Sequence, residues 1–152
     1  MTKILICICT FNRNQNLIGC LNSIKKLKHK NYYDIKILIL DNSISNNSYK
    51  VIQNYKKKSN LDILQNSEKR RGIVNARNKC LKISKNIKPQ YIAFVDDDCR
   101  VDKNWLKNIF HLSKNIEADV ITGPQRYDHT NKAIKNNYSS LFEKKYKNKI
   151  ER

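Results

Sequence analysis

"YIAFVDDDCRVDKNWL", residues 91–106, joins a short apolar run directly to three consecutive aspartates and then to a polar segment. A continuous apolar run of this length is typical of a strand that is buried on both faces of a sheet. In open parallel sheets, ligands bind outside the carboxyl ends of the strands. The stretch therefore predicts an α/β fold with a binding site at Asp96, Asp97 and Asp98.

Four more apolar runs have the same character, and segments with helical periodicity separate them. The runs are residues 3–11, 35–41, 61–66 and 118–123. The helical stripes, each with i, i+3, i+4 or i+7 spacing, are Leu17, Leu21 and Ile24; Val51, Ile52 and Tyr55; Ile73, Ala76, Cys80 and Ile83; and Leu106, Ile109 and Phe110. This alternation predicts five mainly parallel strands with helices on both faces.

Composition limits the class of protein. A length of 152 residues predicts one domain, and an apolar content of 39% excludes a disordered chain. The five cysteines form no CxxC pair, and Cys7 and Cys9 lie in an apolar run as small core residues. We therefore expect a reduced, cytoplasmic protein. No stretch approaches the ~20 apolar residues that span a bilayer, so a soluble or peripheral protein is expected.

Polar residues or glycine follow every predicted strand. Thr10 and Asn12 follow the first, Asp41 the second and Gly123 the fifth. Loops are polar in most proteins, and Asn12 alone is an ordinary turn former. After the third strand, the pair Arg70 and Arg71 precedes a glycine at a helix start, where free N–H groups and guanidinium forks suit a diphosphate. A solvated basic loop would have the same sequence.

The aspartate triplet is harder to explain as an ordinary turn. Three adjacent carboxylates repel one another unless a cation or several donors compensate, and hard divalent ions take carboxylate oxygens readily. A helix N-cap accounts for one acid, such as Asp102, but not for three. The triplet therefore indicates a metal or phosphate-related site.

Five blocks together resemble the family 2 glycosyltransferases, whose nucleotide-sugar-binding domain has the GT-A fold. They occur in the family's order and rough spacing between residue 3 and about residue 125, and they read "ICTFNRNQNLIGCLNSI", "ILILDNS", "RGIVNARNKCL", "YIAFVDDDCRVDKNWL" and "ITGP". The resemblance implies a Rossmann-like, mainly parallel sheet with helices on both faces. It also implies residues 1–125 as the donor-binding domain.

The resemblance assigns roles to residues at the first three strand ends. The acid that binds the nucleotide base falls on Asp41, and the arginine that contacts the nucleotide falls on Arg71. Thr10 matches a position that lines the nucleotide pocket, and Asn12 is expected to belong to the same pocket. Relatives often carry another residue at the position of Asn12, which bears on nucleotide preference.

The triplet corresponds to the DxD motif of the family. Asp96 is expected near the ribose, Asp98 is expected to hold Mn²⁺ or Mg²⁺ on the diphosphate, and Asp97 is counted with the nucleotide-sugar-binding residues. The ion would neutralise both the carboxylates and the leaving diphosphate. Many relatives have a further acid where this chain has Cys99.

Relatives of the family continue into an acceptor-binding half that supplies the catalytic base. Residues 126–152 instead form an expected basic amphipathic tail, the start of an incomplete acceptor half. The catalytic residue is unknown, and the family base is expected beyond Arg152, because the later acids Asp128, Glu143 and Glu151 lie in no motif of the family. The chain is therefore expected to be truncated after the donor half, and to bind its donor but transfer it slowly or not at all.

The expected function is metal-assisted, inverting transfer from a nucleotide-diphosphate sugar, with a UDP-sugar as the expected donor, to a glycan or lipid-linked acceptor. The alternatives are a nucleotide-sugar-binding protein without catalysis and a basic nucleic-acid-binding module. The net charge of +18 suits nucleic acid, but the lysines are scattered and no recognised nucleic-acid motif occurs, so this partner is not expected. Lysines also suit peripheral contact with anionic lipid at the inner face of the membrane, or plain solubility.

Overall fold

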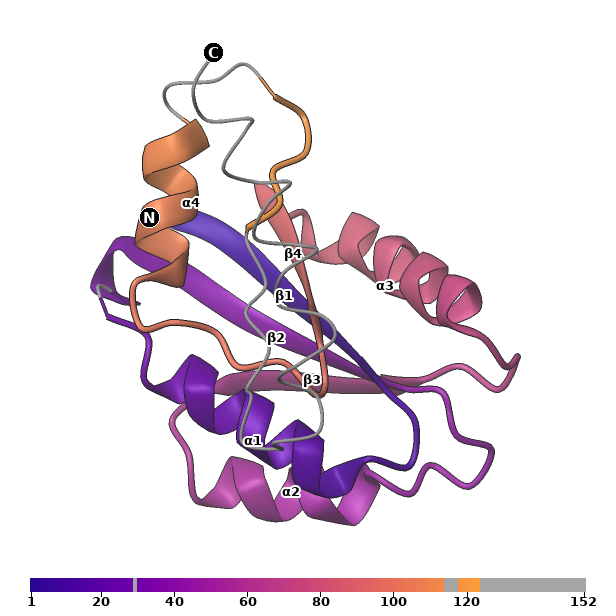
Figure 1. Ribbon diagram of the computed structural model, residues 1–152. Coiled ribbons are helices and arrows are strands. Elements are labelled where there is room, and N and C mark those ends of the chain that lie inside the picture. Colours follow the sequence, from indigo (N-terminus) through magenta and orange to yellow (C-terminus); the bar gives the residue numbers. More distant parts are fainter. Residues whose placement is uncertain (29, 114–117, 124–152) are drawn as a thin grey trace, which may run out of the picture. The chain divides into compact units, whose positions relative to one another are not determined.

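A computed structural model describes residues 1–28, 30–113 and 118–123 (Figure 1). The chain divides into two compact units, Met1–Glu117 and Ala118–Arg152. Every helix and strand of the described residues lies in the first unit.

A parallel sheet forms the centre of the first unit. Its strands are β1 (Thr2–Thr10), β2 (Tyr33–Asp41), β3 (Asp62–Ser67) and β4 (Tyr91–Asp96), in the order β3-β2-β1-β4. All three neighbouring pairs are parallel. The chain first builds outward from β1 to β3 and then returns to the other side of β1. The order therefore reverses between β1 and β4, which is the position where open α/β sheets bind ligands.

The four predicted helices are all present, and a short 3-10 turn precedes β2. Their bounds are α1 (Asn14–Lys25), η1 (Lys30–Tyr32), α2 (Tyr49–Lys57), α3 (Ile73–Ile87) and α4 (Trp105–Ser113). Helices α1, α2 and α4 pack on one face of the sheet, and α3 covers the other (Figure 1). The prediction of a mainly parallel α/β sheet with helices on both faces is thus confirmed.

Two cores result from the alternation of side chains along the strands. The larger core contains Ile4, Ile6, Ile8, Leu17, Cys20, Leu21, Ile24, Leu27, Ile37, Ile39, Ile52, Ile63, Val95 and Leu106. The smaller core lies under α3 and contains Leu5, Cys7, Leu38, Leu40, Ala76 and Cys80. β1 and β2 contribute to both cores, because both of their faces are covered.

Burial of β4 differs from the prediction of a strand that is covered on both faces. Val95 is buried, whereas Ile92 and Phe94 are 38% and 39% exposed. The reason is topological. β4 is an edge strand, and α3 packs mainly over β1 and β2. An apolar run predicts the strand correctly, but it does not say how completely neighbouring elements cover it.

The prediction of a fifth strand at residues 118–123 is wrong. Residues 118–123 are described and form no strand, and Val120 is 83% exposed. A short apolar run becomes a strand only when its backbone groups pair with a neighbouring strand. None of the four strands pairs with this segment.

Residues 126–152, for which the sequence predicts a basic amphipathic tail, lie outside the described residues. The same holds for Asp128, Glu143 and Glu151. Among the helices that are described, none is long and apolar enough to cross a membrane.

Candidate functional site

The carboxyl ends of the strands meet at one edge of the sheet. Thr10 at the end of β1 pairs with Asp41 at the end of β2, and Asp41 pairs with Ser67 at the end of β3. On the other side of β1, Cys9 pairs with Asp96 at the end of β4. The loops that follow all four strands therefore begin at the same level.

A cavity of about 510 Å³ lies at this edge, within the ~300–1,000 Å³ range of small-ligand sites. The ends of β1 and β4, the loop after β2 and the start of α3 form its walls. Its lining residues are Cys9, Thr10, Phe11, Arg13, Asn42, Arg71, Gly72, Ile73, Ala76, Arg77, Asp96, Asp97 and Asp98.

The three aspartates differ sharply in their surroundings. Asp97 is buried, and its Oδ2 accepts a hydrogen bond of 2.7 Å from Thr10 Oγ1. The side chains of Asp96 and Asp98 are 51% and 53% exposed. The turn after β4 thus directs the middle acid towards the end of β1. The outer two acids remain accessible from the cavity.

Arginines compensate the charge of the triplet. Arg77 Nη2 lies 3.0 Å from Asp96 Oδ1, and its guanidinium also lies 5.8 Å from the centre of the Phe94 ring. Arg13 Nη1 lies 3.1 Å from Asp98 Oδ2 and 3.4 Å from an oxygen of Asp97. The donors that let three adjacent acids coexist are therefore side chains from α3, from the loop before α1 and from the end of β1.

The start of α3 brings backbone N–H groups to the cavity. Gly72 precedes the helix with a φ of 115°, a conformation that L-residues rarely adopt. Its N–H donates to Asn42 Oδ1 at 2.9 Å, and Asn42 Nδ2 donates to the carbonyls of Glu68 and Arg70 at 2.7 and 2.8 Å. Asn42 thus fixes the loop that carries Arg71.

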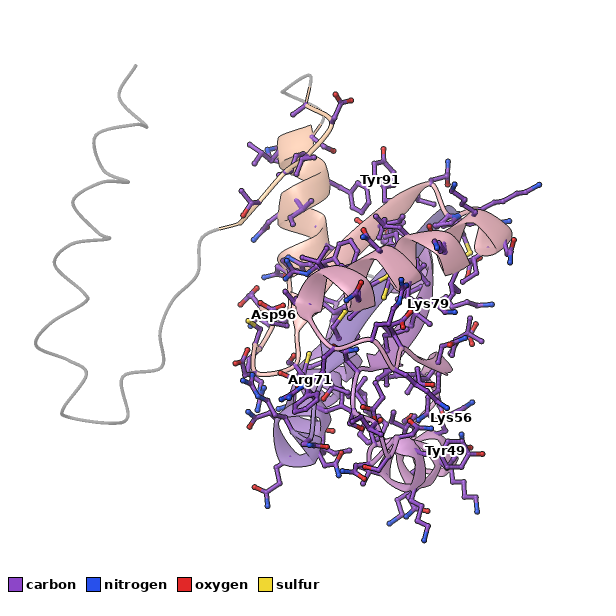
Figure 2. The ribbon with its side chains drawn as sticks, turned by 90° about the vertical axis from the view of Figure 1, so that its right-hand side faces the viewer. Tyr49, Lys56, Arg71, Lys79, Tyr91 and Asp96 are labelled. Atoms are coloured by element: carbon purple, nitrogen blue, oxygen red, sulfur yellow. The ribbon has the colours of Figure 1, made fainter. Side chains whose placement is uncertain are left out.

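Arg71 itself stands beside an aromatic ring. Its guanidinium carbon lies 5.0 Å from the centre of the Phe11 ring, and both residues line the cavity. Figure 2 shows Arg71 and Asp96 at the same end of the sheet, with Tyr91 at the opposite end of β4. The start of α3, the arginine and the acids therefore line one cavity.

Asp41 is buried next to the cavity and does not line it. Its carboxylate accepts hydrogen bonds from Ser43 N at 2.8 Å, Ser48 N at 2.9 Å and Ser48 Oγ at 2.6 Å. Burial is the largest single influence and raises the pKa of this carboxyl, but the bonds from Ser48 and Ser43 together outweigh it and hold the pKa below its ordinary value. Asp41 thus orders the turn after β2 as an ionised group.

Five of the seven predicted site residues line the cavity, namely Thr10, Arg71, Asp96, Asp97 and Asp98. Asn12 and Asp41 lie beside it. Asn12 has a positive φ of 56°, and its Oδ1 accepts a 2.7 Å hydrogen bond from Asn47 Nδ2 in the loop after β2.

Eight further residues line the cavity, and four of them have side chains that could contact a ligand but were given no site role, namely Phe11, Arg13, Asn42 and Arg77. A sequence signal existed for three of them. Phe11 and Arg13 directly follow a strand, and Asn42 follows the next one. Arg77 gave no such signal, because it lies on the second turn of α3 and reaches the cavity along the helix surface.

The donor set fits a divalent ion that is shared with a ligand. Asp96 and Asp98 offer two half-exposed carboxylates, and Asp98 already faces a positive group in Arg13. Within the described residues, no three His, Cys, Asp or Glu side chains are arranged to hold a metal by themselves. Mg²⁺ is usually held by one or two carboxylates together with waters and substrate phosphates, so an incomplete protein site agrees with this chemistry.

Comparison with known proteins gives a family match. The family model of Glycosyl transferase family 2 matches residues 5–152. An uncharacterized protein of Methanocaldococcus jannaschii is 23% identical over 136 residues, which cover 87% of this chain and 57% of that protein. A poly(ribitol-phosphate) beta-glucosyltransferase of Bacillus spizizenii is 28% identical over 123 residues, which cover 80% of this chain and 19% of that enzyme. The chain thus spans little more than half of the first relative and a fifth of the second.

Solved structures show the same fold. Residues 1–349 of TarS from Staphylococcus aureus align with a TM-score of 0.60 at 18% identity, over 82% of this chain and 39% of theirs. A mannosyltransferase of Pyrobaculum calidifontis, solved with GDP-Man and Mn²⁺, aligns with a TM-score of 0.63 at 15% identity, over 72% of this chain and 32% of that one. These likenesses agree with the GT-A fold that the sequence predicted.

Proposed function

The chain belongs to glycosyl transferase family 2, and on this premise we propose that it binds a nucleotide-diphosphate sugar in the cavity between the ends of β1 and β4. The observation that carries the proposal is the convergence of three carboxylates, three arginines and a helix start on one cavity of about 510 Å³. TarS has been solved with UDP and with UDP-GlcNAc, and the mannosyltransferase with GDP-Man. A UDP-sugar is the proposed donor.

Arg71 and the start of α3 are proposed to bind the diphosphate. The N–H groups of a helix start attract anions, and an arginine adds a planar fork of donors that matches phosphate oxygens. Gly72 allows the backbone to approach the ligand closely, because it has no side chain. The hydrogen bonds of Asn42 to this loop support the proposal, since they hold the donors in place before a ligand arrives.

Asp98 is proposed as the metal ligand, with Asp96 beside the ribose. Both side chains are half-exposed at the cavity. Bound Mn²⁺ or Mg²⁺ would supply positive charge to the leaving diphosphate. The Mn²⁺ that accompanies GDP-Man in the Pyrobaculum enzyme supports this assignment.

The remaining predicted residues are proposed to shape the nucleotide pocket. Thr10 and Asp97 join the ends of β1 and β4 by a 2.7 Å hydrogen bond. Asp41 holds the turn after β2 through Ser43 and Ser48, and Asn12 contacts that turn through Asn47. We propose that the nucleoside is placed by these two loops.

Transfer of the sugar to a glycan or lipid-linked acceptor, with inversion, is the proposed reaction. It requires a base within about 3 Å of the acceptor hydroxyl. Each of the three acids of the cavity contacts Arg13, Arg77 or Thr10, so none of them is available as this base. This favours the alternative function for this chain, donor binding without transfer. A panel of glycan acceptors distinguishes the two, because only the first function produces a transferred sugar.

Calorimetry with UDP-, GDP- and TDP-sugars, with and without Mn²⁺, tests the proposed function. We expect one nucleotide class to bind, with an affinity that Mn²⁺ increases and that Asp98→Asn reduces by about tenfold or more, since a bond to a charged group contributes roughly 1.5–3 kcal/mol. Asp62→Asn is the control, because this acid begins β3 at the opposite edge of the sheet. Absence of binding, or equal binding by the Asp98 variant, contradicts the proposal.

A further inference from the structure

Arg13 stands between the loop after β1 and the aspartate triplet. One atom, Nη1, lies 3.1 Å from Asp98 Oδ2 and 3.4 Å from Asp97 Oδ1. Asp97 is fixed in turn by Thr10. The guanidinium therefore occupies the position that faces the carboxylate assigned to the metal.

The two acids that Arg13 contacts differ in their exposure to solvent. The side chain of Asp97 is 5% exposed, whereas those of Arg13 and Asp98 are 56% and 53% exposed. Exposed ion pairs contribute only ~0–1 kcal/mol. The contact between Arg13 and Asp98 can therefore break at little cost, while the buried acid remains in place.

A metal ion at Asp98 would compete with the guanidinium of Arg13. A divalent ion and a guanidinium compete for the single carboxylate of Asp98, because two cations at one acid repel each other. A guanidinium carries five N–H donors in a fork that suits phosphate oxygens. Arg13 lines the same cavity as Arg71 and the start of α3, so a displaced guanidinium has a diphosphate within the same space.

We propose that Arg13 is an exchangeable cation of the donor site. It holds Asp98 while no nucleotide is bound, and it turns to the donor's diphosphate when the metal ion takes its place at Asp98. This inference rests on the proposed function. It makes Arg13 a residue that couples metal and nucleotide binding, so that each ligand raises the affinity for the other by the same factor.

Binding of Mn²⁺ alone tests the first half of the exchange. Electron paramagnetic resonance reports free Mn²⁺ directly and needs no catalytic turnover. Arg13→Ala should bind Mn²⁺ about two- to fivefold more tightly than the wild-type chain, because an exposed competitor has been removed. Equal or weaker binding by the variant overturns the inference.

Binding of UDP in the presence of saturating Mn²⁺ tests the second half. Arg13→Ala should bind UDP roughly ten- to a hundredfold more weakly, since a charge-assisted bond to phosphate has been lost. Opposite signs in the two experiments distinguish an exchangeable cation from a residue that only stabilises the fold. Unchanged UDP affinity overturns the inference even when the Mn²⁺ result is as expected.

Two variants serve as controls. Arg13→Lys keeps the charge without the fork, so it should bind Mn²⁺ like the wild-type chain and UDP with intermediate affinity. Arg100→Ala removes the same charge from a side chain that packs against Gly19 outside the cavity lining, and it should leave both affinities unchanged. If Arg100→Ala reproduces Arg13→Ala, a general charge effect replaces the inference. If the wild-type chain binds neither UDP nor GDP with Mn²⁺, the proposed function fails together with it.

Discussion

Asp41 and Asp97 are two buried acids that organise the site from beneath. Asp97 joins the turn after β4 to Thr10 on β1, and Asp41 holds the turn after β2 through Ser43 and Ser48. A buried charge is tolerated only when hydrogen bonds replace its lost hydration. Each acid meets this condition with backbone or hydroxyl donors, so each fixes the shape of a loop.

Acid titration should reveal the role of Asp41. The pKa of its carboxyl lies below the ordinary value of 3.8, so its ionised form stabilises the fold above that pH, and this contribution is lost as pH falls through the lower folded-state pKa. Asp41→Asn should reduce the free energy of unfolding at pH 7 by ~1.5–3 kcal/mol, as expected for the loss of a hydrogen bond to a charged group. Its stability should also change less than that of the wild-type chain as the pH is lowered from 5 to 2.

Urea denaturation across this pH range measures both effects. Asp62→Asn is the matched control, because Asp62 is exposed and pairs with Lys36 at 3.3 Å on the surface, so its loss should cost no more than about 1 kcal/mol. An Asp41 variant as stable at pH 7 as this control would show that the turn after β2 does not depend on the buried carboxylate.

At the scale of elements, the start of α3 forms part of the cavity wall and is tied to the loop after β2 through Asn42. Gly72 ends the loop that Asn42 holds, and its φ of 115° leads into a first helical turn whose Ile73 and Ala76 line the cavity. A Cβ at this position would meet only Asn75 Nδ2, at 3.8 Å, so space is available. The backbone conformation is the constraint.

Gly72→Ala should therefore destabilise the protein through strain. A non-glycine residue in this region of φ and ψ costs of order 1–3 kcal/mol, and relief of the strain would move the N–H groups at the helix start and weaken UDP binding. Gly123→Ala is the control, since nothing lies within 4 Å of its added methyl group. Urea denaturation and calorimetry with UDP measure the two effects. Wild-type behaviour in both would mean that the loop adopts another conformation.

Sequence patterns predicted the elements better than their surroundings. Four strands and four helices follow from apolar runs and helical spacing, because β1 and β2 are covered on both faces and the helices each bury a stripe. The strand predicted for residues 118–123 is absent because strand formation depends on pairing with a neighbouring strand, and a local sequence pattern gives no information about such a neighbour. In the site, the sequence predicted the strand ends but not the direction of each side chain. Asp41 turns inward, and Arg77 reaches the cavity from α3.

At the scale of the whole molecule, charge is distributed unevenly. The chain carries 31 Lys and Arg against 13 Asp and Glu, and the sequences of α1, α2, α3 and α4 contain no acidic residue. The helical surfaces are therefore basic, while three of the acids face the cavity. Such a field attracts any polyanion at long range, whereas the cavity holds a ligand by short contacts.

Salt should separate these two modes of binding. Raising ionic strength from 0.1 to 1 M shortens the screening length from ~10 to ~3 Å, and it removes contacts that depend on released counterions, as in non-specific binding to DNA. Retention on double-stranded DNA should therefore disappear at 1 M salt, while the affinity for UDP with Mn²⁺ falls only a few-fold. Asp98→Asn should leave DNA retention unchanged at low salt and weaken UDP binding by about tenfold or more. Non-specific attraction by scattered lysines is lost at high salt and does not depend on Asp98. DNA binding that survives 1 M salt, or that depends on Asp98, would therefore favour a nucleic-acid site in the cavity.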